Sequence, residues 1–209
     1  MHPHKKNPSI VYWMESRLYL NVTNRCSNSC YFCFREFKTG INEFNLKLEK
    51  EPTPEEVVEE LRKTINRKSW SEVVFCGFGE PLERLNLVLE VTRWLKKNYG
   101  KSIRVDTNGH GYLLNRGIDV LRELKDAGVD KVSVSLNAQD NATYNQICKP
   151  MFEYAYENVL EFIKKAKEEG LETEVTVVTI SEVDLAKVKE QTERMGAKFA
   201  VRKYIPFFW

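Results

Sequence analysis

The sequence predicts a single α/β domain whose parallel strands curve into an open, partial TIM-type (β/α)6 barrel. Two observations support this fold: short apolar or alternating runs recur six times, and amphipathic helical patterns lie between them. Parallel strands need long crossover connections, which the intervening helices supply. Six strand–helix units are too few to close the eight-stranded form of this barrel. The 209 residues contain no linker, low-complexity tract or internal repeat, so we expect one domain over residues 1–209.

The expected elements alternate along the whole chain. The strands cover residues 18–22, 72–76, 103–106, 132–136, 174–179 and 199–202. The helices cover residues 55–66, 85–97, 118–127, 152–169 and 183–195. Thr53 is the expected N-cap of the first helix, and glycines 128, 170 and 196 end three of the others. The polar segment 40–51 is expected to be an irregular loop.

Composition excludes several classes of protein. Hydrophobic residues make up 42% and charged residues 30% of the chain, as in ordinary globular proteins. The net charge of +2 lacks the strong basic excess that nucleic-acid binding requires. No apolar run is long enough to cross a membrane, and residues 1–7 have no apolar segment behind them, as a signal peptide would. We therefore expect a cytoplasmic protein.

Three of the five cysteines follow the first expected strand as Cys26, Cys30 and Cys33, with C-x3-C-x2-C spacing. Three thiolates can hold three corners of an iron–sulfur cube and leave the fourth iron open for chemistry. The alternatives are a structural zinc site, with a fourth ligand from His110, Cys76 or Cys148, and cysteines that serve only as small core residues. Zinc sites usually draw on two matched ligand pairs, so the single triplet favours the cluster.

Polar or glycine-containing segments also follow the next three strands. They are Gly77–Pro81, Asp106–Gly109 and Ser133–Ala138. In parallel α/β folds, ligands bind beyond the carboxyl ends of the strands, so these segments are expected to lie beside the cysteine loop. Each would also pass as an ordinary turn or strand end on its own.

Taken together, these segments resemble the radical S-adenosylmethionine (SAM) superfamily. The run C-x3-C-x-aromatic-C, with Phe32 as the aromatic residue, is similar to the signature of that superfamily, and Gly77–Pro81 resembles its Gly-Gly-Glu-Pro motif. The resemblance implies one [4Fe–4S] cluster and SAM as cofactors. It also implies reductive cleavage of SAM to methionine and a 5′-deoxyadenosyl radical, which abstracts hydrogen from a substrate.

The resemblance further implies contacts to SAM. Glu80 is suited to accept a hydrogen bond from the methionine ammonium, Phe32 to lie against the adenine, and Phe78 to use its backbone with the ring turned away. Ser135 and Asn137 are expected to face the barrel interior. The full set of expected SAM contacts is Phe32, Gly77, Phe78, Gly79, Glu80, Asp106, Thr107, Asn108, Ser135 and Asn137.

Within the superfamily, the chain is similar to radical SAM proteins linked to TatD-type hydrolases. The similarity lies in residues 20–26, 74–81 and 135–138, in Tyr144, and in residues 149–150 and 202–204. It implies a functional link to such a hydrolase and a flavodoxin- or ferredoxin-type electron donor, but it names no substrate. Asp106–Gly109 gives a more distant likeness to glycyl-radical-enzyme activases, in which Asp106 and Thr107 would help to hold a monovalent cation.

Other residues stay open at this stage. Cys76 is expected to be strand packing and Cys148 a loop residue before Pro150, and His110 is expected at the surface. Arg202 either pairs with an acidic group or is solvated, and the aromatic tail 206–209 either covers the barrel edge or docks a partner. The rival functions are a non-catalytic iron–sulfur electron carrier and a zinc-binding module. Neither has a use for Glu80.

Overall fold

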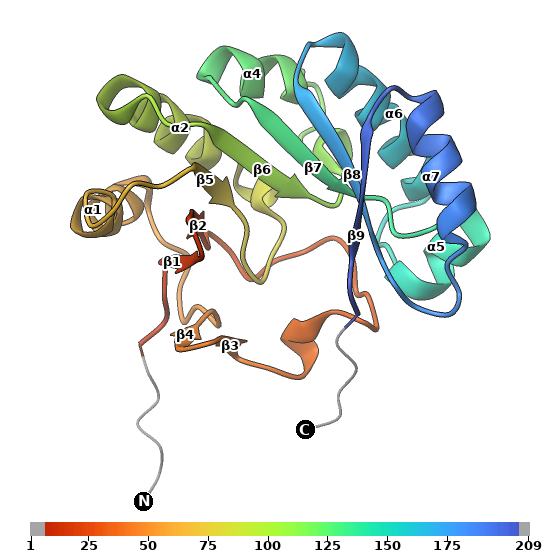
Figure 1. Cartoon of the computed structure of the whole chain (residues 1–209), viewed down its shortest axis with the longest axis horizontal. Coiled ribbons are helices and arrows are strands. Elements are labelled where there is room, and N and C mark those ends of the chain that lie inside the picture. Colours follow the sequence, from red (N-terminus) through yellow and green to blue (C-terminus); the bar gives the residue numbers. More distant parts are fainter. Residues whose placement is uncertain (1–6, 205–209) are drawn as a thin grey trace, which may run out of the picture.

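The computed structural model describes residues 7–204 and shows one curved seven-stranded sheet with helices along its outer face (Figure 1). The sheet order is β1-β2-β5-β6-β7-β8-β9, and the strands from β2 onward pair in parallel. Their bounds are Val11–Met14 (β1), Arg17–Leu20 (β2), Glu72–Phe75 (β5), Ile103–Thr107 (β6), Lys131–Ser135 (β7), Glu172–Val178 (β8) and Lys198–Arg202 (β9). The six predicted parallel strands and the open barrel are confirmed.

The first strand of the sheet, β1, was not predicted. It pairs antiparallel with β2, and Glu15, at the turn between them, has a left-handed backbone with φ of 51°. The rings of Tyr12 and Tyr19 face each other across this pair and stack with centroids 5.0 Å apart. Cross-strand aromatic contacts of this kind stabilise an edge pair that the short sequence pattern alone does not mark.

Helices connect the strands and cover the outer face of the sheet. Their bounds are Pro54–Thr64 (α1), Leu85–Tyr99 (α2), Gly111–Leu114 (α3), Val120–Ala127 (α4), Asn141–Cys148 (α5), Ala155–Glu168 (α6) and Leu185–Arg194 (α7). The short helices α3 and α5 were not predicted, because few turns give a weak apolar period. Within the predicted loop 40–51, Gly40–Ile41 (β3) and Phe44–Asn45 (β4) form a small hairpin.

Local signals set the helix ends as expected. Thr53 caps α1 and forms a capping box with Glu56, in which each side chain bonds the other residue's backbone N–H. Gly128 ends α4 in the left-handed region at φ of 105°, which a residue with a Cβ adopts only with strain. Asp119 caps the start of α4, so this helix begins two residues later than the sequence pattern suggested.

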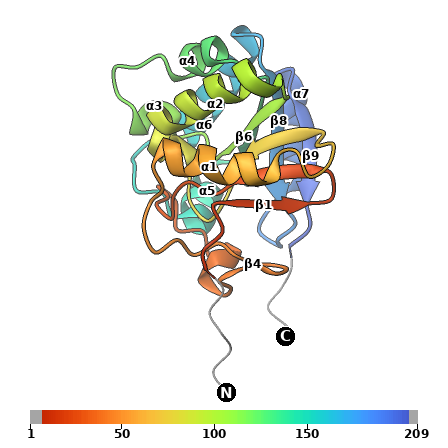
Figure 2. The ribbon, with the colours of Figure 1, turned by 90° about the vertical axis from the view of Figure 1, so that its left-hand side faces the viewer.

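The hydrophobic core lies between the helices and the outer face of the sheet (Figure 2). Residues such as Leu18, Val73 and Val105 point into it, and alternate residues of the same strands point to the inner face. A second, smaller cluster on the inner side joins Tyr12, Tyr19, Leu46, Val74 and Phe78 beneath the β3–β4 hairpin. Within residues 7–204, no helix combines the length and the apolar character that a membrane crossing needs.

Candidate cluster and cofactor site

All the segments singled out in the sequence lie at one end of the sheet. The cysteine loop follows β2, Gly77–Pro81 follows β5, Asp106–Gly109 spans the end of β6, and Ser135 ends β7. Because these strands run parallel, their carboxyl ends share one edge. The predicted convergence of these segments on one face is confirmed.

The cysteine loop places its three thiols near one another, but they do not form a closed ligand set. Cys26, Cys30 and Cys33 are each partly exposed, and the backbone N–H of Cys33 donates to the carbonyl of Cys30 at 3.1 Å. Within residues 7–204, no three His, Cys, Asp or Glu side chains are arranged to hold a metal ion. The side chain of Cys30 is engaged with Cys148.

Cys30 faces Cys148, the buried last residue of α5. An antiparallel bridge pairs Asn28 with Pro150, and the same register sets Cys30 opposite Cys148. The backbone N–H of Ser29 donates to the Cys148 carbonyl at 2.9 Å, and the two thiols share a hydrogen bond. Cys148 is therefore a helix residue packed behind the cysteine loop, and its predicted place in a loop was wrong.

The surroundings keep the three thiols protonated. Burial raises the pKa of Cys26 to about 12, with the Glu80 carboxylate adding to the effect. The hydrogen bond with Cys148, together with burial, raises the pKa of Cys30, and burial raises that of Cys33. The Arg35 guanidinium opposes each of these shifts, since a nearby positive charge favours the thiolate. Metal ligation requires thiolates, so binding a cluster releases these protons.

The donor set fits an iron–sulfur cluster. Three thiols lie in residues 26–33 of one loop, and the side-chain amide Nδ2 of Asn108 lies 3.8 Å from Cys26 Sγ. Hydrogen bonds to ligating sulfur are a regular feature of such clusters. For all three cysteines to act as ligands, Cys30 must exchange its Cys148 contact for the metal.

Arg35, which the sequence analysis did not single out, joins the cysteine loop to the glycine turn. Its guanidinium donates to the carbonyls of Asn24 at 3.3 Å, Asn28 at 3.1 Å and Phe78 at 3.4 Å. The only sequence signal was a cation two residues after Cys33, inside an aromatic run. Its carbonyl partners come from two separate loops, so only the tertiary structure reveals this role.

Glu80 is buried and accepts three hydrogen bonds within the protein. Its Oε1 accepts from the Thr107 hydroxyl at 2.8 Å and the Leu82 N–H at 3.1 Å, and its Oε2 accepts from the Asn108 N–H at 2.6 Å. Burial raises the pKa of Glu80 to about 7, while these three hydrogen bonds favour the charged form. The carboxylate retains acceptor capacity, so contact with a SAM ammonium stays a prediction, and so does a SAM contact by Thr107.

The two glycines of the turn lie too close to neighbouring chain for any side chain. A Cβ on Gly77 would approach the Asn21 side chain to 2.1 Å, and one on Gly79 would approach the Arg25 carbonyl oxygen to 2.3 Å. The ring of Phe78 packs into the inner cluster and meets Phe34 edge-on at 5.3 Å. The turn thus lies directly against the cysteine loop, with its backbone as the contact surface.

Charged side chains of neighbouring strands form ion pairs on the inner face of the sheet. Arg104 pairs with Glu72 at 3.0 Å and with Asp106 at 2.8 Å, and Arg202 lies 3.6 Å from Asp106. Arg202 also reaches the Ser133 hydroxyl at 3.5 Å, so it is ion-paired within the protein. Asp106 Oδ1 and Arg104 Nε are buried and lack a well-aligned hydrogen bond among the described residues. This face is therefore polar and able to accept further hydrogen-bonding partners.

Two further predicted contacts lie at the end of β7. The hydroxyls of Ser135 and Thr176 are 3.4 Å apart, and Asn137 is buried with a left-handed backbone at φ of 58°. Asn137 therefore marks the turn at the strand end and does not continue the alternation of β7. Phe32 is half-buried and packs against the main core, edge-on to Tyr31. The roles of these three residues toward SAM stay predictions.

His110 is fully buried, so its predicted place at the surface was wrong. Its Nδ1 lies 2.9 Å from the Ser27 hydroxyl and its Nε2 lies 3.0 Å from the Tyr144 hydroxyl. Both ring nitrogens are thus occupied, which removes His110 as a fourth zinc ligand. Burial lowers the pKa of His110 to about 4, so the ring is neutral near pH 7.

Replacing His110 by Asn is expected to flatten the pH dependence of stability. Between about pH 6.5 and about pH 4, His110 is protonated in the unfolded chain but neutral in the folded protein. The free energy of unfolding therefore decreases as the pH is lowered through this window. At about 1.4 kcal/mol per pH unit, the parent should lose about 2 kcal/mol between about pH 7.5 and about pH 5 that the variant does not lose. Urea unfolding at both pH values measures this difference. Equal losses in the two proteins would contradict the assignment.

Cys76 and the aromatic tail 206–209 are the remaining residues that the sequence singled out. Cys76 follows β5 and packs against the inner cluster, and burial raises the pKa of its thiol to about 12. Cys76 thus matches the expected packing role. The aromatic tail 206–209 lies outside the described residues.

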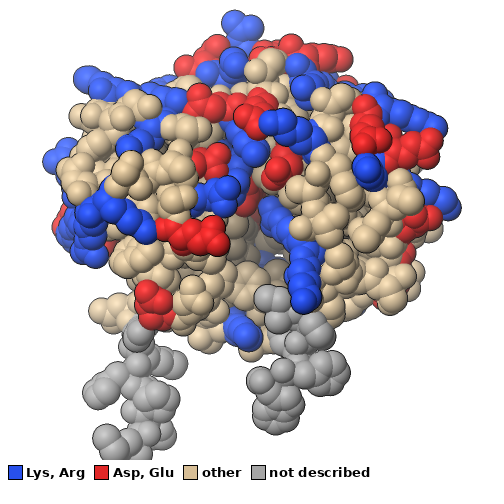
Figure 3. All heavy atoms as spheres, in the orientation of Figure 1, with Lys and Arg blue, Asp and Glu red and all other residues tan. Residues whose placement is uncertain are grey.

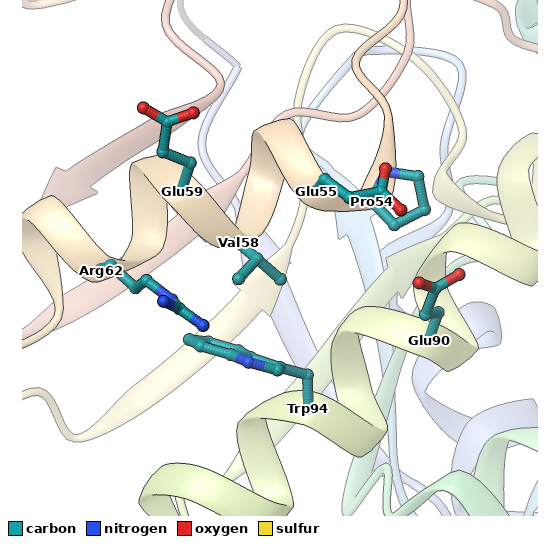
Figure 4. Close-up of a pocket in the computed structure, with 7 residues that line it drawn as sticks. All are labelled: Pro54, Glu55, Val58, Glu59, Arg62, Glu90 and Trp94. Atoms are coloured by element: carbon teal, nitrogen blue, oxygen red, sulfur yellow. The ribbon is translucent and has the colours of Figure 1, made fainter.

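Two of the hollows formed by the described residues differ in whether motif residues line them. One of about 520 Å³ opens at Cys26 and is lined by Asn24, Cys26, Arg35, Glu36, Phe37, Lys38, Thr39, Lys47 and Phe78. Basic and acidic side chains are mixed over the face drawn in Figure 3. The other, of about 470 Å³, lies between α1 and α2, where Arg62 lies over the Trp94 ring (Figure 4). None of the motif residues lines it, so we place the site at the first hollow.

Comparison with known proteins identifies the family of the chain. A model of the radical SAM superfamily matches residues 20–191. A probable GTP 3′,8-cyclase of Methanocaldococcus jannaschii is 30% identical over 192 residues, which cover 90% of this chain and 59% of that relative. A probable GTP 3′,8-cyclase of Saccharolobus solfataricus is 32% identical over 154 residues, which cover 74% of this chain and 44% of the relative. The chain thus spans about half the length of these relatives.

Solved structures share the fold at low sequence identity. TYW1 with a lysine–pyruvate adduct superposes with a TM-score of 0.65 at 20% identity, over 92% of this chain and 66% of that one. SuiB of Streptococcus suis, bound to its precursor peptide SuiA, gives a TM-score of 0.69 at 15% identity, over 93% and 40% of the two chains. At these identities the likeness extends to the fold alone.

Proposed function

Since the chain belongs to the radical SAM superfamily, whose enzymes use a [4Fe–4S] cluster and SAM, we propose that Cys26, Cys30 and Cys33 hold its cluster. When bound, the two cofactors together supply reductive cleavage of SAM and hydrogen abstraction from a substrate. One observation carries the assignment of the site: Asn108 bonds Glu80 through its backbone and reaches Cys26 with its side chain. A single residue thus joins the expected SAM site to the expected cluster site.

The residues around the thiols prepare the site in three ways. Arg35 holds the cysteine loop against the glycine turn and favours thiolates at the three ligands. Glu80 presents a buried carboxylate whose orientation is fixed by three donors. Gly77 and Gly79 let the backbone approach closely, so the turn can contact SAM through N–H and C=O groups.

The inner face of the sheet carries matched charges: Arg104 pairs with Glu72 and Asp106, and Lys131 pairs with Glu174 at 3.6 Å. Glu72, Arg104 and Lys131 lie at the amino ends of β5, β6 and β7. These three residues are therefore remote from the carboxyl-end edge, where ligands bind in parallel α/β folds, and their ion pairs do not decide the charge of the substrate.

Two narrower assignments compete for the substrate. The names of the relatives favour GTP 3′,8-cyclisation, whereas the residues described above resemble TatD-linked radical SAM proteins. The ion pairs of the inner face do not decide between the two, and we retain a functional link to a TatD-type hydrolase as the second hypothesis. A flavodoxin- or ferredoxin-type donor would supply the electron, and the free thiols suit a reducing compartment such as the cytoplasm.

Anaerobic reconstitution with iron and sulfide, followed by dithionite and SAM, tests the proposed function. We expect one cluster per chain and release of 5′-deoxyadenosine. A 3′,8-cyclised product from added GTP would favour the assignment that the names of the relatives suggest. Cluster formation without 5′-deoxyadenosine would favour the non-catalytic electron carrier. Uptake of zinc in place of iron would favour the binding module.

Replacing Glu80 by Ala is expected to weaken SAM binding about ten- to a hundredfold. A charge-assisted hydrogen bond to the methionine ammonium contributes about 1.5–3 kcal/mol, and each 1.4 kcal/mol or so is tenfold in affinity. Glu80→Gln should bind SAM with intermediate affinity, since an amide oxygen accepts the bond without the charge. Iron content should stay unchanged in both variants, because the hydrogen bonds of Glu80 go to Leu82, Thr107 and Asn108 and to no thiol. A SAM titration followed by EPR measures the change in affinity. If Glu80→Ala binds SAM with the affinity of the parent, Gly77–Pro81 is a structural turn and not a SAM contact.

A further inference from the structure

A network of buried polar side chains lies directly behind the cysteine loop. His110 and Tyr144 are fully buried, and Ser27, Asn28 and Asn108 are each exposed by 8% or less. Buried polar groups are retained when they bond one another, and networks of this kind fix a single arrangement. This network of side chains ends at the loop that carries the expected cluster ligands.

His110 is hydrogen-bonded at both ring nitrogens within this network. Asn28 Nδ2 donates to the Tyr144 oxygen at 3.0 Å, and the Tyr144 hydroxyl lies 3.0 Å from His110 Nε2. On the other side of the ring, His110 Nδ1 lies 2.9 Å from Ser27 Oγ, a hydroxyl that can serve this bond as donor or as acceptor.

Asn108 is held at both ends of its side-chain amide. Its Oδ1 accepts from the backbone N–H of His110 at 3.0 Å, which fixes Nδ2 on the opposite side. One hydrogen of Nδ2 goes to Ser27 Oγ at 2.9 Å, and the other points toward Cys26 Sγ at 3.8 Å. The His110 ring and backbone thus both orient the amide that reaches the sulfur.

We propose that His110 is a positioning residue that, through Ser27 and Asn108, fixes an N–H···S hydrogen bond to Cys26 and so raises the reduction potential of the cluster. The inference rests on the proposed function. A hydrogen-bond donor at a ligating sulfur stabilises negative charge, and the reduced cluster carries one more negative charge than the oxidised one. Loss of the bond therefore makes the cluster harder to reduce.

Two replacements of His110 separate positioning from packing. An Asn at position 110 places an amide nitrogen near where Nδ1 lies, and a Gln places it near Nε2. His110→Asn should therefore keep the hydrogen bond to Ser27 and the parental potential. His110→Gln should lower the reduction equilibrium constant three- to tenfold, equivalent to roughly 30–60 mV at 59 mV per decade. The measurement is an EPR-monitored redox titration of the reconstituted cluster without SAM.

Asn108→Leu and Tyr144→Phe complete the test. Asn108→Leu removes the N–H itself and should lower the potential at least as much as His110→Gln. Tyr144→Phe removes a hydroxyl on the side of the imidazole away from Ser27 and should leave the potential unchanged. An equal shift in all the variants would mean general loosening and would overturn the proposal, as would a parental potential in Asn108→Leu. If the parent takes up no cluster, the proposed function fails, and this inference fails with it.

Discussion

Replacing Cys26, Cys30 or Cys33 by Ala is expected to abolish the [4Fe–4S] cluster and, with it, SAM cleavage. Each change removes one of three thiol ligands that the loop provides, and the fourth iron has no protein ligand in reserve. Iron and sulfide content, the visible spectrum of the reconstituted protein and 5′-deoxyadenosine release measure the loss. The effect should be complete, because two protein ligands are too few to hold a cluster in this loop.

Cys148 and Cys76 provide the matched controls. Cys148→Ala removes the hydrogen-bond partner of Cys30 and should free the Cys30 thiol, so the cluster should still form. Cys76→Ala alters only packing in the inner cluster and should also keep the cluster. Loss of the cluster in Cys148→Ala with retention in Cys30→Ala would instead identify Cys148 as the ligand.

The second large effect is expected at Gly79. A Cβ there would lie 2.3 Å from the Arg25 carbonyl oxygen and 2.6 Å from that of Thr23, far inside van der Waals contact. Both obstacles are backbone, so the cysteine loop itself must move, and the hydrogen bond of 2.8 Å from the Glu80 N–H to the Arg25 carbonyl must lengthen or break. Gly79→Ala should reduce iron content at least tenfold, measured after reconstitution under the conditions used for the parent.

Gly100→Ala controls for the general effect of losing a glycine. Gly100 ends α2 at φ of 56°, and a Cβ added there would meet no atom within 4 Å, so its substitution costs about 1 kcal/mol of backbone strain far from the site. It should lower the stability of the protein but leave iron content at the parental level. A parental iron content in Gly79→Ala would show that the turn and the cysteine loop are not coupled as the structure indicates.

The sequence predicted the parts of the fold that depend on local physical chemistry. The capping box of Thr53 and the left-handed backbone of Gly128 operate within a few residues, so their sequence signals placed helix ends closely. The six parallel strands followed from apolar runs that pack against helices. The hairpin strand β1, of four residues, and the helix α5, of eight residues, were missed, because elements this short give too weak a periodic signal.

The candidate site likewise has features that the sequence predicted and features that only the tertiary structure revealed. The spacing of Cys26, Cys30 and Cys33 predicted the cluster, since ligand spacing is a local property. SAM followed from the resemblance of the cysteine loop and the strand-end segments to the radical SAM superfamily. Only the tertiary structure placed Arg35 across two loops, buried His110 and set Cys30 against Cys148. Each of these depends on residues that are far apart in the chain and meet only when the sheet assembles. A hydrogen bond between such residues leaves no periodic or compositional trace in the sequence, because its geometry is set by the packing of separate elements.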